Sequence, residues 1–431
     1  MLDIQFIRDN PVLVAKRSLQ KGYEIDVEGL LGLDTHKRQL QQQVEELRRQ
    51  RNEIAENTKG QKPDPDHIAK GREIKANILD LEHQLSSVEN DFMVLLKTIP
   101  NMPLDSVPIG TTEADNVVIR EVGEHPSFDF ELKNHAQIAE AKGWLDKERA
   151  TKIAGARFVY TMGDLVRLEF ALWQFGMDVL GNKDILQKII SDNNLNISAK
   201  PFVPILPPAV AKQEVFEATG RLNKQEQTYK IEDEDLWLNA SAEHTIAPIF
   251  LNEILPVSDL PIRFVGYTTA FRREAGTYGK DTEGIFRLHQ FNKLEMESFT
   301  TSDSSLDEHL FMVAIQEYLM TQLGLPYRVL EKCTADIGRP NAKGVDIDAW
   351  LPSQAVYRET HTADYITDYQ ARAMKTRVRQ DDGSIELVHT NDATAFSQRP
   401  LIAIIENFQT AEGDVRVPEI LRPYMGGKEV I

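Results

Sequence analysis

Between positions 33 and 99 the apolar residues follow two separate helical repeats. The first has spacings of 7, 4, 3 and 7, and the second alternates between 4 and 3, as a heptad seam does. The members are Leu33, Leu40, Val44, Leu47 and Ile54, and then Ile74, Ile78, Leu81, Leu85, Val88, Phe92, Leu95 and Ile99. A break at 59–66 holds one glycine and two prolines, through which a helix cannot continue. The pattern predicts an antiparallel two-helix coiled-coil arm at about 33–99, whose helices reach about 40 Å.

Shorter elements flank this arm on both sides. Residues 1–30 read as a short helical start, because Asp9, Asn10 and Pro11 favour the beginning of a helix. Three prolines at 100, 103 and 108 mark a linker, and short strands and helices alternate after it. We expect helices over 163–181, 307–323 and 397–410, and strands over 262–271, 285–299 and 385–390.

Together these elements predict an α+β protein. The hairpin-like succession of strands, with helices between them, favours an antiparallel sheet with flanking helices. We therefore expect an N-terminal domain over 1–105, which carries the arm, and a second domain over 106–431. A chain of 431 residues has ample material for this division.

Composition restricts the cellular setting. Hydrophobic residues make up 41% and charged residues 27%, which is typical of a soluble globular protein. No apolar run is long enough to span a membrane, and the first residues do not resemble a secretory signal. The single cysteine, Cys333, excludes an intrachain disulfide and a cysteine-based metal site. We expect a cytoplasmic protein with no membrane partner.

The charge of the arm differs from that of the whole chain. The chain has a formal net charge of −18, which argues against a general nucleic-acid binder. Between Lys37 and Lys75, however, ten basic side chains outnumber seven acidic ones. These charges suit a solvated coiled-coil face as well as a surface that binds nucleic acid. The length of the arm favours contact with a partner.

Residues 271–299 hold the most informative candidate chemistry. Arg272, Arg273 and Glu274 open this stretch, and Phe291 and Glu295 follow at an even spacing on an expected strand. Arginine binds phosphate in a planar, bidentate way, a phenylalanine can stack on a base, and a glutamate can hold an amine or a hydroxyl. Each residue alone also suits a surface ion pair, a core aromatic or a solvated strand position.

Other nucleotide and metal motifs are missing from the sequence. It contains no GxxxxGK[ST] or GxGxxG loop, no HExxH and no Cys/His zinc spacing. A nucleotide site would therefore depend on arginines and carboxylates, and Glu243, Glu359 and Arg399 are further candidates.

Several segments in order along the whole chain resemble the bacterial type of seryl-tRNA synthetase, a class II aminoacyl-tRNA synthetase family. They are the N-terminal Met1–Pro11, Gly155–Tyr160, Ser241–Glu243, Phe271–Phe299, Trp350–Gln354, Tyr357–Glu359, Asp368–Arg372, Ile405–Gln409 and Val417–Gly426. The resemblance implies a class II antiparallel sheet and a homodimer. It also implies a ligase that forms seryl-adenylate from serine and ATP and then charges tRNA(Ser), held by the arm. It leaves open whether tRNA(Sec) is charged too.

The resemblance also implies roles for individual residues. The implied catalytic residues are Arg272, Glu295 and Arg399. The implied serine-binding residues are Ser241, Ala242, Glu243, Arg272, Glu295 and Thr394. The implied ATP-binding residues are Arg272, Arg273, Glu274, Leu288, Phe291, Glu359, Thr360, His361, Thr362 and Arg399, of which Glu359 and Thr362 would ligate Mg²⁺.

The chain departs from the family pattern at His389–Arg399, which is one residue shorter than usual. An alignment from Arg399 puts Ala393 at the position of the serine-binding hydroxyl, and an alignment through Ala-Thr-Ala puts Thr394 there. We prefer Thr394, because the substrate hydroxyl needs a polar partner. Two other functions stay open: a synthetase paralogue that acylates a carrier protein, whose relatives tend to lack the arm, and a degenerate relative without catalysis.

Overall fold

The computed structural model describes residues 1–57, 65–222, 227–274 and 283–431. It divides into two compact units, an N-terminal unit over Met1–Met102 and a C-terminal unit over Pro103–Ile431. The sequence placed this division after residue 105. The expected break at 59–66 lies largely outside the described residues, as does the part of the candidate stretch 271–299 between 275 and 282.

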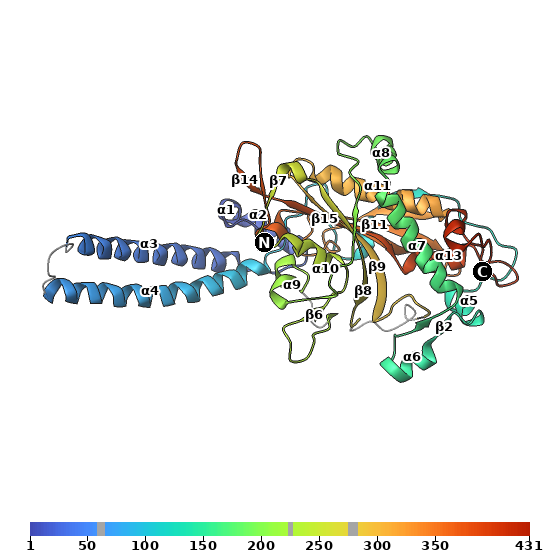
Figure 1. The fold of residues 1–431 in the computed structure, drawn as a ribbon, viewed down its shortest axis with the longest axis horizontal. Coiled ribbons are helices and arrows are strands. Elements are labelled where there is room, and N and C mark those ends of the chain that lie inside the picture. Colours follow the sequence, from blue (N-terminus) through green and yellow to red (C-terminus); the bar gives the residue numbers. More distant parts are fainter. Residues whose placement is uncertain (58–64, 223–226, 275–282) are drawn as a thin grey trace. The chain divides into compact units, whose positions relative to one another are not determined.

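The described residues of the N-terminal unit form four helices, and the last two make the expected hairpin (Figure 1). The helices are α1 (Ile4–Asp9), α2 (Pro11–Gln20), α3 (Val27–Asn57) and α4 (Pro65–Thr98). Asp3 caps α1 by accepting from the Gln5 amide at 2.7 Å, and Pro11 occupies the first turn of α2. The short helical start predicted over 1–30 is therefore two helices and the first turn of α3.

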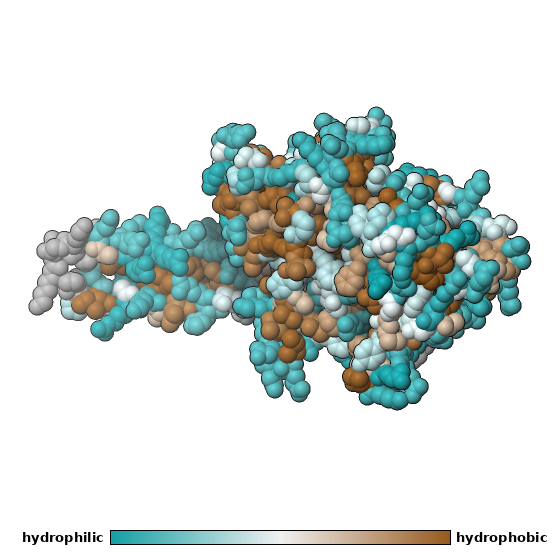
Figure 2. Space-filling model, turned by 45° about the vertical axis from the view of Figure 1, so that its right-hand side comes forward, coloured by the Kyte–Doolittle hydropathy of each residue, from teal (hydrophilic) through white to brown (hydrophobic). Residues whose placement is uncertain are grey.

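The heptad seam joins α3 to α4. All thirteen seam residues are buried or half-buried, which confirms the coiled-coil prediction. Polar contacts fix the same register, since Gln41 donates to Glu89 at 3.4 Å and Arg48 pairs with Glu82 at 2.7 Å. On the face shown in Figure 2, hydrophilic residues cover most of the hairpin, with hydrophobic residues between them.

The C-terminal unit is centred on an eight-stranded sheet of order β1-β10-β11-β12-β15-β9-β8-β4. All neighbouring pairs are antiparallel except β4 with β8, which confirms the predicted antiparallel sheet. The strands are β1 (Val117–Val122), β4 (Val203–Ile205), β8 (Ile262–Phe271), β9 (Gln290–Thr300), β10 (Tyr327–Glu331), β11 (Lys343–Leu351), β12 (Val356–Thr367) and β15 (His389–Ser397).

Smaller elements surround this sheet. A three-stranded sheet contains β7 (Ile254–Pro256), β13 (Arg377–Arg379) and β14 (Ile385–Leu387), and two pairs are β2 (Leu145–Asp146) with β3 (Tyr160–Thr161) and β5 (Val210–Ala211) with β6 (Trp237–Leu238). The α-helices are α5 (His135–Ala141), α6 (Lys147–Ala154), α7 (Asp164–Gly181), α8 (Lys183–Asp192), α9 (Gln213–Thr219), α10 (Glu243–Ile246), α11 (Ser305–Leu323), α12 (Tyr369–Met374) and α13 (Arg399–Asn407).

Helices α7, α11 and α13 supply much of the main hydrophobic core. They pack against one face of the large sheet, to which β9 contributes Leu294 and Met296, both fully buried. Since side chains alternate along a strand, Phe291, Lys293 and Glu295 face the other side of the sheet. The core thus fixes which face of β9 is left for a polar site.

Three of the expected elements have different bounds. The strand expected over 285–299 begins only at Gln290, because Ile285 and Leu288 are buried in a turn that the Phe286 amide closes onto Glu283 at 3.2 Å. The strand expected over 385–390 is divided between two sheets, since β14 ends at Leu387 and β15 of the large sheet begins at His389. The helix expected over 397–410 is shortened to α13, because β15 continues to Ser397.

The other elements match closely. The predicted strand 262–271 is β8, and the helices expected over 163–181 and 307–323 are α7 and α11. Cys333 is fully buried. Among the described residues, we find no helix with the length and apolar character needed to cross a membrane.

Candidate active site

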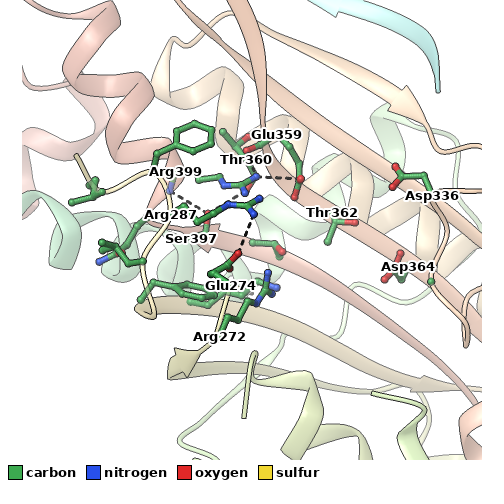
Figure 3. A pocket seen from close by; sticks show the side chains of 18 of the residues that line it. Arg272, Glu274, Arg287, Asp336, Glu359, Thr360, Thr362, Asp364, Ser397 and Arg399 are labelled. Carbon is green, nitrogen blue, oxygen red and sulfur yellow. Dashed lines mark hydrogen bonds and ion pairs between the residues drawn. The ribbon is translucent and has the colours of Figure 1, made fainter. Parts of the chain in front are cut away.

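A pocket of about 380 Å³ lies on the polar side of the large sheet (Figure 3). It collects side chains from the end of β8, from the turn before β9, and from β9, β12, β15 and the first turn of α13. Nine of the residues implied by the family resemblance line it: Arg272, Glu274, Leu288, Phe291, Glu359, Thr360, Thr362, Thr394 and Arg399. Segments more than 120 residues apart therefore form one site.

One side of the pocket is formed by the β8–β9 hairpin (Figure 3). The guanidinium of Arg272 lies over the Phe291 ring, 5.1 Å from its centroid, and its Nε donates to the Ala240 carbonyl at 3.2 Å. Glu274 pairs with Arg287 at 3.0 Å, and it has a left-handed backbone with φ of 48°. This side presents cations beside an aromatic ring, which suits phosphate and base.

The opposite side carries Glu359, Thr360 and Thr362 of β12, with Arg399 at the start of α13 (Figure 3). Arg399 pairs with the Glu359 carboxylate at 3.2 Å and donates to its carbonyl at 2.8 Å. The Glu359 side chain is 51% exposed in the open pocket, so desolvation raises its pKa only weakly, and the charges of Arg399 and Lys332 outweigh this and lower the pKa. This carboxylate is therefore ionised at neutral pH.

A β-bulge explains how Glu359 and Thr362 come to share the pocket although they are three residues apart. Glu359 pairs with Asp348 and His361 with the adjacent Ile347, so that Thr360 is an extra residue in β12. A bulge of this kind redirects the side chains that follow it. The two predicted metal ligands therefore both line the pocket.

The donor set of Glu359 and Thr362 fits Mg²⁺. A carboxylate and a hydroxyl are hard oxygen ligands, and Mg²⁺ usually takes one or two protein ligands together with substrate phosphates and waters. Within the described part of the chain, no group of three or more His, Cys, Asp and Glu residues is placed to hold a metal ion. The residues present therefore suit an ion that arrives with a nucleotide better than a metal enclosed by protein ligands.

A second bulge determines which residue of His389–Arg399 lines the pocket. In β15, Thr394 pairs with Glu295 and Phe396 pairs with Leu294, so that Ala395 is the extra residue. Thr394 lines the pocket, whereas Ala393 is fully buried and belongs to the main hydrophobic core. The geometry therefore favours Thr394 as the hydroxyl of the site.

Two of the remaining serine-binding candidates, Ser241 and Glu295, meet at Lys293, which lines the pocket. The Lys293 ammonium donates to the Ser241 hydroxyl at 2.9 Å and pairs with Glu295 at 2.6 Å. Glu243 is also buried, and its Oε2 has no hydrogen-bond partner among the described residues. Burial raises the pKa of Glu243, but the charge of Lys293 and neighbouring cations outweighs it, so the net shift is downward.

A close packing contact brings Ser241 and Glu243 to the strands. Gly266 of β8 lies opposite Glu295, and a Cβ there would come within 2.2 Å of the Ile246 side chain and 3.5 Å of Ala242. A Cβ at this position would have to displace the end of the Ile246 side chain, so the glycine lets the start of α10 lie against the sheet as it is packed here. Ala242 thus serves packing, with no exposed side-chain surface.

Some implied residues lie elsewhere among the described positions. Arg273 does not line the pocket, and its amide donates to Gln227. His361 of β12 is buried and does not line the pocket. Its ring nitrogens contact the Thr360 hydroxyl at 2.8 Å and the Ala395 carbonyl at 3.1 Å. These contacts position His361 to support both bulges.

Other pocket residues were not predicted from the sequence. They are Arg221, Ile285, Phe286, Arg287, Lys293, Lys332, Asp336, Gly338, Asn341, Asp364, Ser397 and Gln398. The alternation from Phe291 to Glu295 could have indicated Lys293. No local pattern could have found Arg221, which pairs with Asp392 of β15 across 171 residues of sequence. Burial raises the pKa of Asp392 to about 7 against the opposing charge of Arg221.

Comparison with known proteins agrees with this geometry. Residues 222–408 match the family model described as the tRNA synthetase class II core domain (G, H, P, S and T). The sheet and its pocket are therefore those of a class II aminoacyl-tRNA synthetase.

Residues 1–103 match the seryl-tRNA synthetase N-terminal domain. The chain is 38% identical to the serine–tRNA ligase of Syntrophotalea carbinolica and 39% identical to that of Exiguobacterium sibiricum, in each case over the whole of both chains. The crystal structure of seryl-tRNA synthetase from Pyrococcus horikoshii complexed with ATP superposes with a TM-score of 0.88 at 35% identity, over 100% of this chain and 99% of that one. The chain thus belongs to the seryl-tRNA synthetase family, whose members are serine–tRNA ligases.

Proposed function

We propose that the chain activates L-serine with ATP and transfers the serine to the 3′ end of tRNA(Ser). The observation that carries this proposal is that residues suited to a nucleotide and residues suited to serine are joined in one pocket. Arg272, Phe291 and Arg399 suit a nucleotide triphosphate, and Thr394 and Lys293 connect it to the buried serine-binding candidates.

The first step needs no nucleophile from the enzyme. The serine carboxylate attacks the α-phosphorus, the bond to the bridging oxygen of pyrophosphate breaks, and pyrophosphate leaves. Catalysis then consists of positioning and charge neutralisation. In this proposal Arg272 binds the serine carboxylate and the α-phosphate, Arg399 binds the γ-phosphate and Phe291 stacks on adenine. Glu359 and Thr362 would hold Mg²⁺, which neutralises phosphate charge when bound.

Serine selection is assigned to the residues beneath the nucleotide. Thr394 and the buried carboxylates offer partners for a hydroxyl and an ammonium, and the free Oε2 of Glu243 is one of them. Alanine would leave such a buried acceptor without its donor, which disfavours it strongly. We assign the catalytic role of Glu295 to binding serine and not to proton transfer.

The second step is the transfer of serine to the terminal ribose of tRNA. We assign tRNA binding to the α3–α4 hairpin of the N-terminal unit, and chemistry to the C-terminal unit. A homodimer follows from the family, and exposed apolar side chains at the β4 edge, Val203 and Leu206, suit a subunit interface. We place the reaction in the cytoplasm. A carrier-protein acylase is disfavoured by the presence of the hairpin.

Charging of tRNA tests the complete proposal. Purified chain, ATP, Mg²⁺ and unfractionated tRNA should give acid-precipitable labelled serine, and the product should be sensitive to mild base, as an ester is. Labelled alanine and threonine serve as controls and should not be incorporated. Incorporation of another amino acid in place of serine would contradict the proposal.

Thr394→Ala should weaken serine activation more than ATP binding. The loss of one hydroxyl in a buried site should raise the serine KM by about tenfold, while the ATP KM changes little. Steady-state ATP–pyrophosphate exchange measures both constants. Thr394→Ser, which keeps the hydroxyl, is the matched control and should stay close to the unsubstituted chain. An unchanged serine KM in Thr394→Ala would remove Thr394 from the serine site.

A further inference from the structure

Lys293 lies between side chains that are assigned to serine binding above. It extends from β9, only 7% of its surface is exposed, and its ammonium contacts Ser241 and Glu295 together. These are two of the side chains assigned to serine above. The Lys293 ammonium thus lies among the groups that we assign to the recognition of serine.

The surroundings of Lys293 are rich in carboxylates. The acidic groups that face it are Glu243 from α10, Glu295 and Glu297 from β9, and Asp392 from β15. The basic and imidazole groups are Arg221 after α9, His244 from α10, Arg272 at the end of β8 and His361 from β12. Arg221 is engaged with Asp392, so Lys293 is the cation in contact with Glu295.

We propose that Lys293 is a positioning residue for serine, which keeps Glu295 available as a charged acceptor and fixes the Ser241 hydroxyl before serine enters. This inference rests on the proposed activation of serine. Lys293 acts through Glu295 and Ser241 and does not contact the reacting phosphorus. In this respect it differs from Arg272 and Arg399.

The physical reason lies in the burial of Glu295, which has no exposed surface. Burial raises the pKa of Glu295 well above its usual value, the nearby carboxylates of Glu243 and Asp392 raise it further, and Lys293, in ion-pair contact at 2.6 Å, is the group that opposes them. Loss of the ammonium would therefore raise this pKa still more. A protonated Glu295 cannot pair with the serine ammonium, so serine binding should fail first on the acidic side.

Lys293→Met tests this inference through the pH dependence of serine binding. In serine-dependent ATP–pyrophosphate exchange, the variant should raise the serine KM by about 10- to 100-fold at neutral pH. As the pH falls, its serine KM should begin to climb at a higher pH than in the unsubstituted chain. The ATP KM should stay nearly constant. Lys293→Arg, which keeps the charge, should restore the position of the pH profile at least in part.

Lys343→Met is the matched control. Lys343 also pairs with a carboxylate, that of Glu331 on the neighbouring strand β10, but it does not line the pocket. Its substitution should leave the serine KM and its pH profile as they are. An equal shift in both lysine variants would assign the effect to general loss of an ion pair and overturn the inference.

A double variant keeps the test decisive if Lys293→Met does not fold. Lys293→Met with Glu295→Gln removes both charges, which avoids an uncompensated buried carboxylate. Calorimetry with a non-hydrolysable seryl-sulfamoyl adenosine should show that Lys293→Met adds no further loss of affinity once Glu295 is already Gln. Additive losses, or a serine KM and pH profile unchanged in Lys293→Met, would overturn the inference. The absence of serine-dependent exchange in the unsubstituted chain would instead overturn the proposed function.

Discussion

Removal of residues 42–88 should abolish charging of tRNA with serine and leave serine-dependent ATP–pyrophosphate exchange within about twofold of the full chain. Gln41 and Glu89 are hydrogen-bonded across the hairpin at 3.4 Å, so a short Gly-Ser linker can join the two helices there. The pocket residues all belong to the C-terminal unit, which has its own hydrophobic core. The deletion therefore separates the two steps of the reaction.

Two sets of substitutions in the hairpin refine this experiment. Replacing the exposed Arg51, Lys70, Arg72 and Lys75 with Gln should raise the KM for tRNA and flatten its salt dependence, because fewer phosphates are neutralised. Replacing the exposed Glu53 and Glu73 with Gln is the control of opposite sign, for which no loss is expected. Full charging by the deletion variant would show that the hairpin does not bind the tRNA.

Arg272→Ala should lower the rate of serine-dependent exchange by about 100- to 1,000-fold, the usual cost of removing one preorganised donor from a developing negative charge. Arg272 is held at the mouth of the serine subsite by the Ala240 carbonyl and by the Phe291 ring. These two contacts therefore fix the orientation of the Arg272 guanidinium. Arg272→Lys should recover little, because an ammonium does not reproduce a bidentate contact with two acceptors.

Arg379→Ala is a suitable control for this experiment. Arg379 is exposed on β13 of the small sheet and is not part of the pocket. Thermal unfolding of both variants should remain close to that of the unsubstituted chain. Exchange activity of Arg272→Ala within about threefold of the unsubstituted chain would exclude the assigned role of Arg272.

The regular patterns of the sequence predicted the regular parts of the fold. The heptads gave the α3–α4 hairpin, because apolar spacing alone decides which helix faces meet. The strand over 262–271 agrees with β8 to the residue. Apolar spacing mispredicts a strand where buried apolar residues belong to a turn, as Ile285 and Leu288 do before β9.

The candidate site was predictable only in part. Phe291 and Glu295 could be placed on one face of a strand by their spacing, and Lys293 between them was overlooked as a member of the same row. The bulges at Thr360 and Ala395 could not be foreseen, since a bulge depends on the register of a neighbouring strand. They decide that Glu359 and Thr362 share a face and that Thr394 enters the pocket.

Contacts between residues far apart in the chain could not be predicted from the sequence either. Arg221 meets Asp392 and Lys293 meets Ser241 only after the sheet and α10 have assembled. The family resemblance indicated the members of the serine site but not the lysine that joins them. Buried charges of this kind depend on tertiary structure, which a single sequence does not display.

Amino-acid-dependent ATP–pyrophosphate exchange tests the central claim, activation of serine, most directly. The purified chain should be assayed with each of the standard amino acids in turn, without tRNA, with threonine, alanine and cysteine as the closest competitors in size. The account predicts rapid exchange with serine and exchange with the other amino acids lower by about 100-fold or more. No exchange with serine, or equal exchange with alanine, would contradict it.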